Sequence, residues 1–530
     1  GKESEKAVNF NDVVIHDTFW SAKQKEFICE VIPTGIENIS KTGSNNSGGL
    51  ENLKHAAQLR GYYGGTSAAD FDPYFRATGW QEGATDNLYF LDTDTYKMIE
   101  AMSYALQLDP AGDTEVEAKQ AEFRELLDTW IGYIEGAQET YLDESGNPVD
   151  NQELDQYDGY LQTYFTLKNA AGKTNGVKRL TNFSWHEMYC FGHFYEAAAA
   201  YTRATNYEDL RLFNVAIRNA DMVNRLFGEG RWESYPGHQE IELGLVKLAT
   251  VCEELAALGK DTPTLECLQK TGTYSSRVTD YVNLAKFFLD MRGKEMNHGY
   301  FSDFLNDPYY RQNWTTVQNQ DIAAGHSVRA MYQYSAMADI ASWMDADDYD
   351  SALNSIWEDL QTKTYVTGGI GSKGGTSSAE GFGSSWYLPN DNAYAETCAN
   401  IGSMMWGQRM NLLNRDAEYI DTVETALYNS VLSGVNFDGD KFFYQNPMSS
   451  NGDQDRSAWF GCACCPPNLM RTVASLGGYI YTHDDSSVTV NLYIGNHADI
   501  TVGGQTVGLN LDTDMPWYGT SEITVEERTL

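Results

Sequence analysis

The sequence predicts a mainly helical protein with a β part, in which a closed toroid of paired helices is followed by an antiparallel β-sandwich. Helical periodicity dominates residues 20–435, and alternation of apolar and polar residues replaces it after about residue 437. Short breaks rich in Gly, Asn, Asp and Pro separate many of the helical segments, and helices joined by short loops pack as antiparallel neighbours. A superhelical solenoid is the alternative, but the sequence shows no fixed repeat period to support it.

About twelve amphipathic segments make up the helical part. In residues 121–136 the apolar side chains recur at the spacing of one helix face, at Phe123, Leu126, Leu127, Trp130, Ile131 and Ile134. The other segments are 21–38, 51–62, 92–108, 185–204, 207–227, 239–256, 279–292, 326–344, 350–364, 392–413 and 417–435. We therefore expect one helical domain over residues 18–436.

Strand-like alternation marks the C-terminal part of the chain. It occurs in residues 441–447, 487–495, 497–503, 505–512 and 521–527, with turn-forming clusters at 436–440 and 483–487. Residues 8–15 alternate in the same way. We expect residues 8–17 and 437–530 to form the β-sandwich. The region 367–391 is a long Gly/Ser-rich loop, and long ordered loops are often functional.

Charge limits the classes of partner. The chain has 75 Asp and Glu against 37 Lys and Arg, a net charge of −38, which argues against a nucleic-acid backbone or an anionic membrane surface as partner. Neutral substrates such as sugars remain compatible. No stretch reaches about 18 apolar residues, so we expect no membrane insertion. The first ten residues lack the apolar core of a signal peptide, and the choice between a secreted or cell-surface and a cytoplasmic location stays open, as does the oligomeric state.

The cysteines predict a metal site. Eight cysteines are too sparse for a disulfide scaffold, but Cys462, Cys464 and Cys465 lie within four positions, and Cys398 follows Glu396 by two. Thiolates and a carboxylate are suitable zinc ligands, and four such groups complete a tetrahedron. Because the spacing is not that of a zinc finger, buried structural cysteines and an oxidisable pair remain alternatives. The prolines that follow Cys465 place Cys464 at or just before a helix N-terminus, where the helix dipole favours a thiolate.

Together these segments resemble the glycoside hydrolase family that includes bacterial β-L-arabinofuranosidases, family 127 and its close relative 146. The resemblance is carried by the motifs DGYL (158–161), HEMYCFGHFYEAA (186–198), PGHQEIELGLVKL (236–248), GHSVRAMY (325–332), GGIGS (368–372), AEGFG with Glu380, LPNDNAYAETCANIG (388–402), ETALYN (424–429), FFYQNP (442–447), CACCPPN (462–468) and TDMPWYG (513–519).

The resemblance implies a catalytic (α/α)6 barrel followed by β-sandwich domains, and a retaining mechanism with a cysteine nucleophile held on Zn2+. By motif, Glu396, Cys398, Cys464 and Cys465 resemble the zinc ligands, Cys464 the nucleophile and Glu380 the acid/base. Residues 460–478 would then return from the β region to the active site. Zinc would keep the sulfur deprotonated and make it a better leaving group than a free thiolate.

Sugar-binding residues follow from the same motifs. His186, His193, His326, Tyr444 and Glu424 fall in family motifs and are expected to contact the furanose. The three histidines have a plainer interpretation as core histidines, and Glu424 has one as part of a solvated helix face. His238, Glu240 and Glu242 look like a metal cluster. Spacings of 2 and 4 on a helix do not put all three side chains on one face, so we interpret these residues as structural.

The leading hypothesis is an exo-acting glycoside hydrolase that releases terminal β-L-arabinofuranose from plant-type oligosaccharides or glycoprotein glycans. The same machinery acting on another furanoside or modified L-sugar is the runner-up. A non-catalytic carbohydrate-binding protein with a structural zinc is a different class, and a thiol redox protein is disfavoured because no CxxC occurs in a βαβ context.

Overall fold

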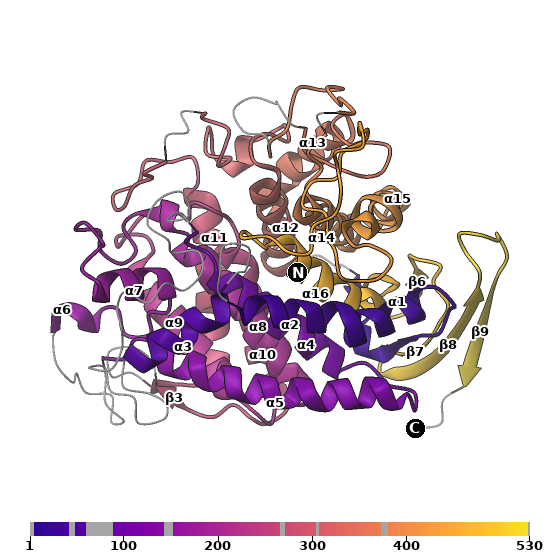
Figure 1. Cartoon of the computed structure of the whole chain (residues 1–530), viewed down its shortest axis with the longest axis horizontal. Helices are drawn as coiled ribbons and strands as arrows, with labels where there is room; N and C mark the ends of the chain where they lie inside the picture. The colour runs from indigo at the N-terminus through magenta and orange to yellow at the C-terminus, as the bar shows by residue number, and fades with distance from the viewer. Residues whose placement is uncertain are drawn as a thin grey trace.

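The computed structural model describes residues 5–41, 48–59, 88–141, 152–265, 271–303, 307–372, 380–391 and 393–527. Helices make up most of it, and the strands of its two larger sheets lie at one side, where both ends of the chain contribute to them (Figure 1). Within these ranges, no helix is long and apolar enough to span a membrane.

A closed ring of helices forms the centre of the molecule. Among the described residues the ring has six members, α4 (Asp92–Leu106), α8 (Glu187–Ala204), α10 (Ile241–Ala257), α12 (Ser327–Met344), α14 (Thr397–Asn414) and α16 (Cys465–Ala474). Each packs against the next in this order, and α16 packs against α4. Most of their residues are buried, and these include polar and charged side chains such as Lys97 and Glu100 of α4. The predicted mainly helical toroid is confirmed.

Amphipathic helices cover the outside of this ring. They are α1 (Trp20–Glu26), α2 (Ile32–Ile39), α3 (Gly49–Leu59), α5 (Thr114–Ala137), α6 (Gln152–Asp155), α7 (Thr163–Ala170), α9 (Arg211–Leu226), α11 (Val278–Met291), α13 (Asp350–Gln361) and α15 (Ala417–Ala426). In α5 the apolar stripe that the sequence shows is the buried face, with Phe123, Leu127, Ile131 and Ile134 all 0% exposed.

Two glycines let α8 and α10 approach closely. A Cβ on Gly192 would lie 2.6 Å from the carbonyl carbon of Glu240, and one on Gly244 would lie 2.6 Å from the Gly192 oxygen. Backbone atoms cannot give way as a flexible side chain can. The two helices therefore pack at a separation that only glycine permits at these positions.

Two antiparallel sheets make up the β part of the described chain. One has the order β1 (Lys6–Ala7), β5 (Tyr481–His483), β6 (Val488–Val490), and the other β2 (Val13–Ile15), β7 (Asn496–Val502), β8 (Gln505–Thr513), β9 (Ser521–Glu527). Val14 pairs with His497, so the N-terminal segment extends the C-terminal sheet. A short hairpin, β3 (Thr264–Leu265) with β4 (Thr271–Gly272), stands apart.

Residues 441–447 differ from the strand that their alternation suggests. Phe442 forms only isolated bridges, to Val435 and Ser457. The backbone around it pairs instead with the start of α14, since Thr397 N donates to Tyr444 O at 3.0 Å and Asn446 N donates to Tyr394 O at 2.9 Å. The segment therefore packs at the N-terminal end of α14 and does not belong to a sheet.

Candidate metal and active site

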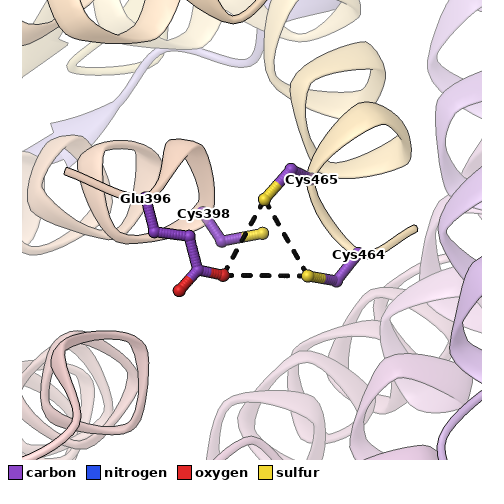
Figure 2. A group of neighbouring side chains, drawn as sticks. All are labelled: Glu396, Cys398, Cys464 and Cys465. Atoms are coloured by element: carbon purple, nitrogen blue, oxygen red, sulfur yellow. Dashed lines mark hydrogen bonds between the residues drawn. The ribbon is translucent and has the colours of Figure 1, made fainter. Parts of the chain in front are cut away.

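Two helix N-termini bring four donor groups together. Glu396 is the residue before α14 and Cys398 lies in its first turn, while Cys464 precedes α16 and Cys465 is its first residue. Because α14 and α16 are neighbours in the ring, these side chains face one another across a short gap (Figure 2). All four are buried, and their donor atoms lie within 4.8 Å of one another. We call these four residues the cysteine cluster.

The distances within the cysteine cluster suit a tetrahedral metal ion. Cys464 Sγ lies 3.8 Å from Cys465 Sγ and 3.7 Å from Glu396 Oε1, and Cys465 Sγ lies 3.8 Å from the same oxygen. A tetrahedron with Zn–S bonds of about 2.3 Å has S–S edges of about 3.8 Å. Three sulfur donors and a carboxylate are a donor set that zinc accepts.

Electrostatics gives a second indication of a cation. Burial raises the pKa of Glu396 well above its ordinary value, and the charges of Glu380 and Cys464 add to this effect. Burial also raises the pKa of Cys398 and of Cys465. Glu396 Oε2 has no hydrogen-bond partner among the described residues. Three thiols and a carboxyl group cannot all ionise side by side without a compensating charge, so the residues fit a bound divalent cation.

Cys464 differs from the other thiols. Its pKa lies well below the ordinary value because the thiols of Cys398, Cys462 and Cys465 donate hydrogen bonds to its sulfur. The positive charge of Lys97 acts in the same direction, while burial opposes both. A thiolate is the nucleophilic form of cysteine, so Cys464 is the cysteine best prepared to attack a substrate.

Glu380 lies at the edge of the cysteine cluster. His326 Nε2 is 2.7 Å from Glu380 Oε2, and the hydroxyls of Tyr394 and Tyr444 donate to Oε1 at 3.3 and 3.5 Å. The Tyr444 hydroxyl also lies 3.4 Å from Cys464 Sγ. One phenol therefore contacts both Glu380 and Cys464. The Glu380 carbonyl accepts a hydrogen bond from Ser327 N at 3.1 Å, which ties the Gly/Ser-rich loop to the start of α12.

Three imidazoles lie next to one another, and His326 among them contacts Glu380. The rings of His186 and His238 are 5.9 Å apart, and those of His238 and His326 are 5.7 Å apart. Burial, with the charge of Arg329, lowers the pKa of His186 to about 3 and that of His238 well below its ordinary value. Neutral imidazoles offer one donor and one acceptor each, which suits sugar hydroxyls.

Two predicted sugar-binding residues lie elsewhere. His193 is 0% exposed, with Nδ1 3.3 Å from Glu240 Oε1. It forms a second buried group with Glu196 and Glu240, but Lys247 and Arg471 already contact Glu196 at 2.7 and 2.9 Å.

Glu424 lines a cavity with Phe19, Tyr428 and Trp517, and the cysteine cluster does not line that cavity. Sugar binding by His193 and Glu424 stays a prediction.

Three further residues near this site were not predicted to take part in it. His238 was interpreted as part of a helix, but α10 begins at Ile241, so its ring is free to face His186. Its position in the family motif PGHQE, residues 236–240, was the feature of the sequence that could have marked His238 as a site residue. Tyr394 stands in the same motif as Glu396. Lys97, from α4, donates to the Cys464 carbonyl at 3.3 Å, and no local pattern marks it.

Comparisons with known proteins agree with this geometry. The family model for the beta-L-arabinofuranosidase GH127 catalytic domain matches residues 12–478. This chain belongs to glycoside hydrolase family 127. The resemblance inferred from the motifs is thus confirmed, and so is the (α/α)6 barrel with a β part.

Individual family 127 proteins are similar over nearly the whole chain. The non-reducing end beta-L-arabinofuranosidase of Bifidobacterium longum subsp. longum is 30% identical, over 97% of this chain and 72% of that protein. A solved GH127 beta-arabinofuranosidase has a TM-score of 0.77 at 33% identity, over 99% of this chain and 70% of its own. The crystal structure of a GH127 beta-L-arabinofuranosidase from Geobacillus stearothermophilus T6 has a TM-score of 0.77 at 32% identity, over 97% and 72%. The protein is therefore a glycoside hydrolase that acts on glycans.

Proposed function

We propose that this family 127 protein is a retaining exo-glycosidase that releases terminal β-L-arabinofuranose from plant-type oligosaccharides or glycoprotein glycans. The names of its relatives support the sugar. The observation that carries the mechanism is the Tyr444 hydroxyl, which contacts Cys464 Sγ and Glu380 Oε1 at 3.4 and 3.5 Å. A nucleophile and an acid/base that share one hydrogen-bonding partner are close enough to act on the same glycosidic bond.

Glu396, Cys398, Cys464 and Cys465 would hold the metal ion, and their donor set favours Zn2+. When bound, zinc would keep the thiolates deprotonated and stabilise the sulfur as a leaving group.

In the first step the Cys464 sulfur attacks the anomeric carbon and forms a carbon–sulfur bond. The bond from that carbon to the glycosidic oxygen breaks, and Glu380 gives this oxygen its proton. Half-buried Tyr444 orients both reacting groups, because its hydroxyl contacts each.

In the second step Glu380, now ionised, removes a proton from water, and the water oxygen attacks the anomeric carbon. The carbon–sulfur bond breaks and Cys464 recovers its thiolate. Two inversions retain the configuration at the anomeric carbon. We propose that His326, which contacts Glu380, and His186, whose ring lies 5.9 Å from that of His238, bind the furanose hydroxyls together with Tyr444.

Metal analysis paired with hydrolysis tests this function. We expect one zinc per chain and release of the chromophore from an aryl β-L-arabinofuranoside but not from the α anomer. Cys464→Ser should abolish turnover, whereas Cys252→Ser, at a buried cysteine of α10, should not. Hydrolysis of a different furanoside alone would assign the runner-up substrate, and zinc without any hydrolysis would contradict the catalytic proposal.

A further inference from the structure

Lys97 is a lysine with no exposed surface, on the face of α4 that meets α16. Its side chain is 0% exposed, and its ammonium donates to the backbone carbonyl of Cys464 at 3.3 Å. Its charge acts on the thiols of both Cys398 and Cys464. A lysine buried this completely is costly unless negative charge compensates it, and here that charge comes from Cys398 and Cys464 of the cysteine cluster and, after them, from Asp94.

The charge balance of the cluster calls for such a cation. Three thiolates and one carboxylate carry four negative charges, and a divalent metal ion supplies two positive ones, so the occupied site keeps an excess of two negative charges inside the barrel. Burying this excess without a counter-charge is unfavourable. Lys97 halves it.

The start of α16 cannot supply this positive charge in full. A helix N-terminus normally presents its first four N–H groups, which form the positive end of the helix dipole. In α16, Pro466 and Pro467 directly follow Cys465, and proline has no N–H. The helix that carries both cysteines therefore has a weakened positive end, beside which the Lys97 ammonium lies.

Lys97 also belongs to a two-point attachment of α16 to α4. One turn further along α4, Glu100 Oε1 accepts from Arg471 Nη1 at 2.8 Å. Lys97 thus contacts the first end of α16 and Glu100 contacts a residue near its last turn. A sliding or tilting of α16 that displaced Cys464 would break both contacts.

We propose that Lys97 is a positioning residue of the active site, which supplies the buried counter-charge of the cysteine cluster and fixes the backbone of Cys464. The inference rests on the proposed function, since it takes the cluster to hold a metal ion. It adds a requirement for a permanent positive charge at a residue that does not touch the substrate.

The test compares Lys97→Gln and Lys97→Arg in the zinc-loaded enzyme. Gln keeps a donor for the Cys464 carbonyl and removes the charge, and Arg keeps both. Lys363→Gln is the matched control, because Lys363 is also buried and its ammonium also donates to a backbone carbonyl, that of Ala323 at 2.8 Å. The primary measurement is the rate at which each protein loses zinc to a chelator at one pH, with circular dichroism to verify folding.

We expect Lys97→Gln to lose zinc about 10–100-fold faster than wild type, the range typical of residues that support metal ligands, and Lys97→Arg and Lys363→Gln to stay within about threefold. Equal rates for Lys97→Gln and wild type would overturn the inference. If Lys97→Gln does not fold, the result for Lys97→Arg decides. This variant keeps the positive charge, so zinc loss about tenfold faster than from wild type would exclude a role of the charge. Wild-type protein that holds no zinc would instead contradict the proposed function.

Discussion

At the scale of single residues, the contact of Glu380 with His326 controls when Glu380, the proposed acid/base, can give a proton. Burial raises the pKa of Glu380, but the charge and hydrogen bond of His326, with the charge of Arg329, outweigh it and hold that pKa below its ordinary value. Glu380 is therefore ionised at neutral pH, ready as the base of the second step. As an acid it must first take up a proton.

Replacing His326 should move the pH dependence in a defined direction. In His326→Ala the influence that lowers the Glu380 pKa is lost while burial remains, so that pKa rises. Since Glu380 must be protonated to act as the acid, the alkaline limb of the kcat/KM profile should shift to higher pH with a poor leaving group. His298→Ala, at a ring stacked on Trp232, is the control. An alkaline limb that stays in place would show that His326 does not control Glu380.

The cysteine cluster was predictable at this scale because cysteine is rare and its motifs are specific. The surroundings of these cysteines were not. Lys97 stands 367 residues before Cys464, and only the closed ring brings them into contact. His238 was missed because we expected it to lie on a helix with Glu240 and Glu242, whereas α10 begins only at Ile241.

At the scale of elements, the contact between α8 and α10 depends on glycine. Gly192→Ala should lower the melting temperature, corresponding to a loss of about 1–3 kcal/mol, because the new methyl group meets the Glu240 backbone. Gly519→Ala, at a position with open space around it, should leave the melting temperature unchanged. A Gly192→Ala protein as stable as wild type would mean that the two helices can separate without cost.

Periodicity predicted the long helices because each has either an apolar stripe or an apolar surface all round. It failed for residues 441–447, where alternation suggests a strand. Backbone hydrogen bonds to residues 394–397 occupy that segment, and such long-range pairing leaves no mark in the local pattern.

At the scale of the whole molecule, the excess of acidic residues should make stability depend on salt. With a net charge of −38, self-repulsion opposes the compact state, and salt screens it. The melting temperature should therefore rise between about 0.01 M and 0.3 M sodium chloride, where the Debye length falls from about 30 Å to below about 8 Å. A melting temperature that falls over this range would indicate that attractive ion pairs outweigh the repulsion.

Hydrophobic periodicity could not predict how the ring of helices closes. Its sixth described helix, α16, follows α14 only after α15 and a long irregular stretch. The need to bring Cys464 to Glu396, together with the family resemblance, predicted that return. A toroid predicted from apolar spacing alone does not specify which segment completes it.

The proposed mechanism depends most on Cys464 as the nucleophile, and a trapped intermediate tests this role directly. Glu380→Gln removes the base of the second step and leaves the cysteine cluster intact. With an activated aryl β-L-arabinofuranoside, whose leaving group needs little protonation, the first step should proceed and the second should slow by about 10²–10⁴-fold. Mass spectrometry of the digested protein should then show a pentosyl adduct on the peptide that contains Cys464. An adduct on a carboxylate such as Glu396, or hydrolysis at the wild-type rate, would contradict the account.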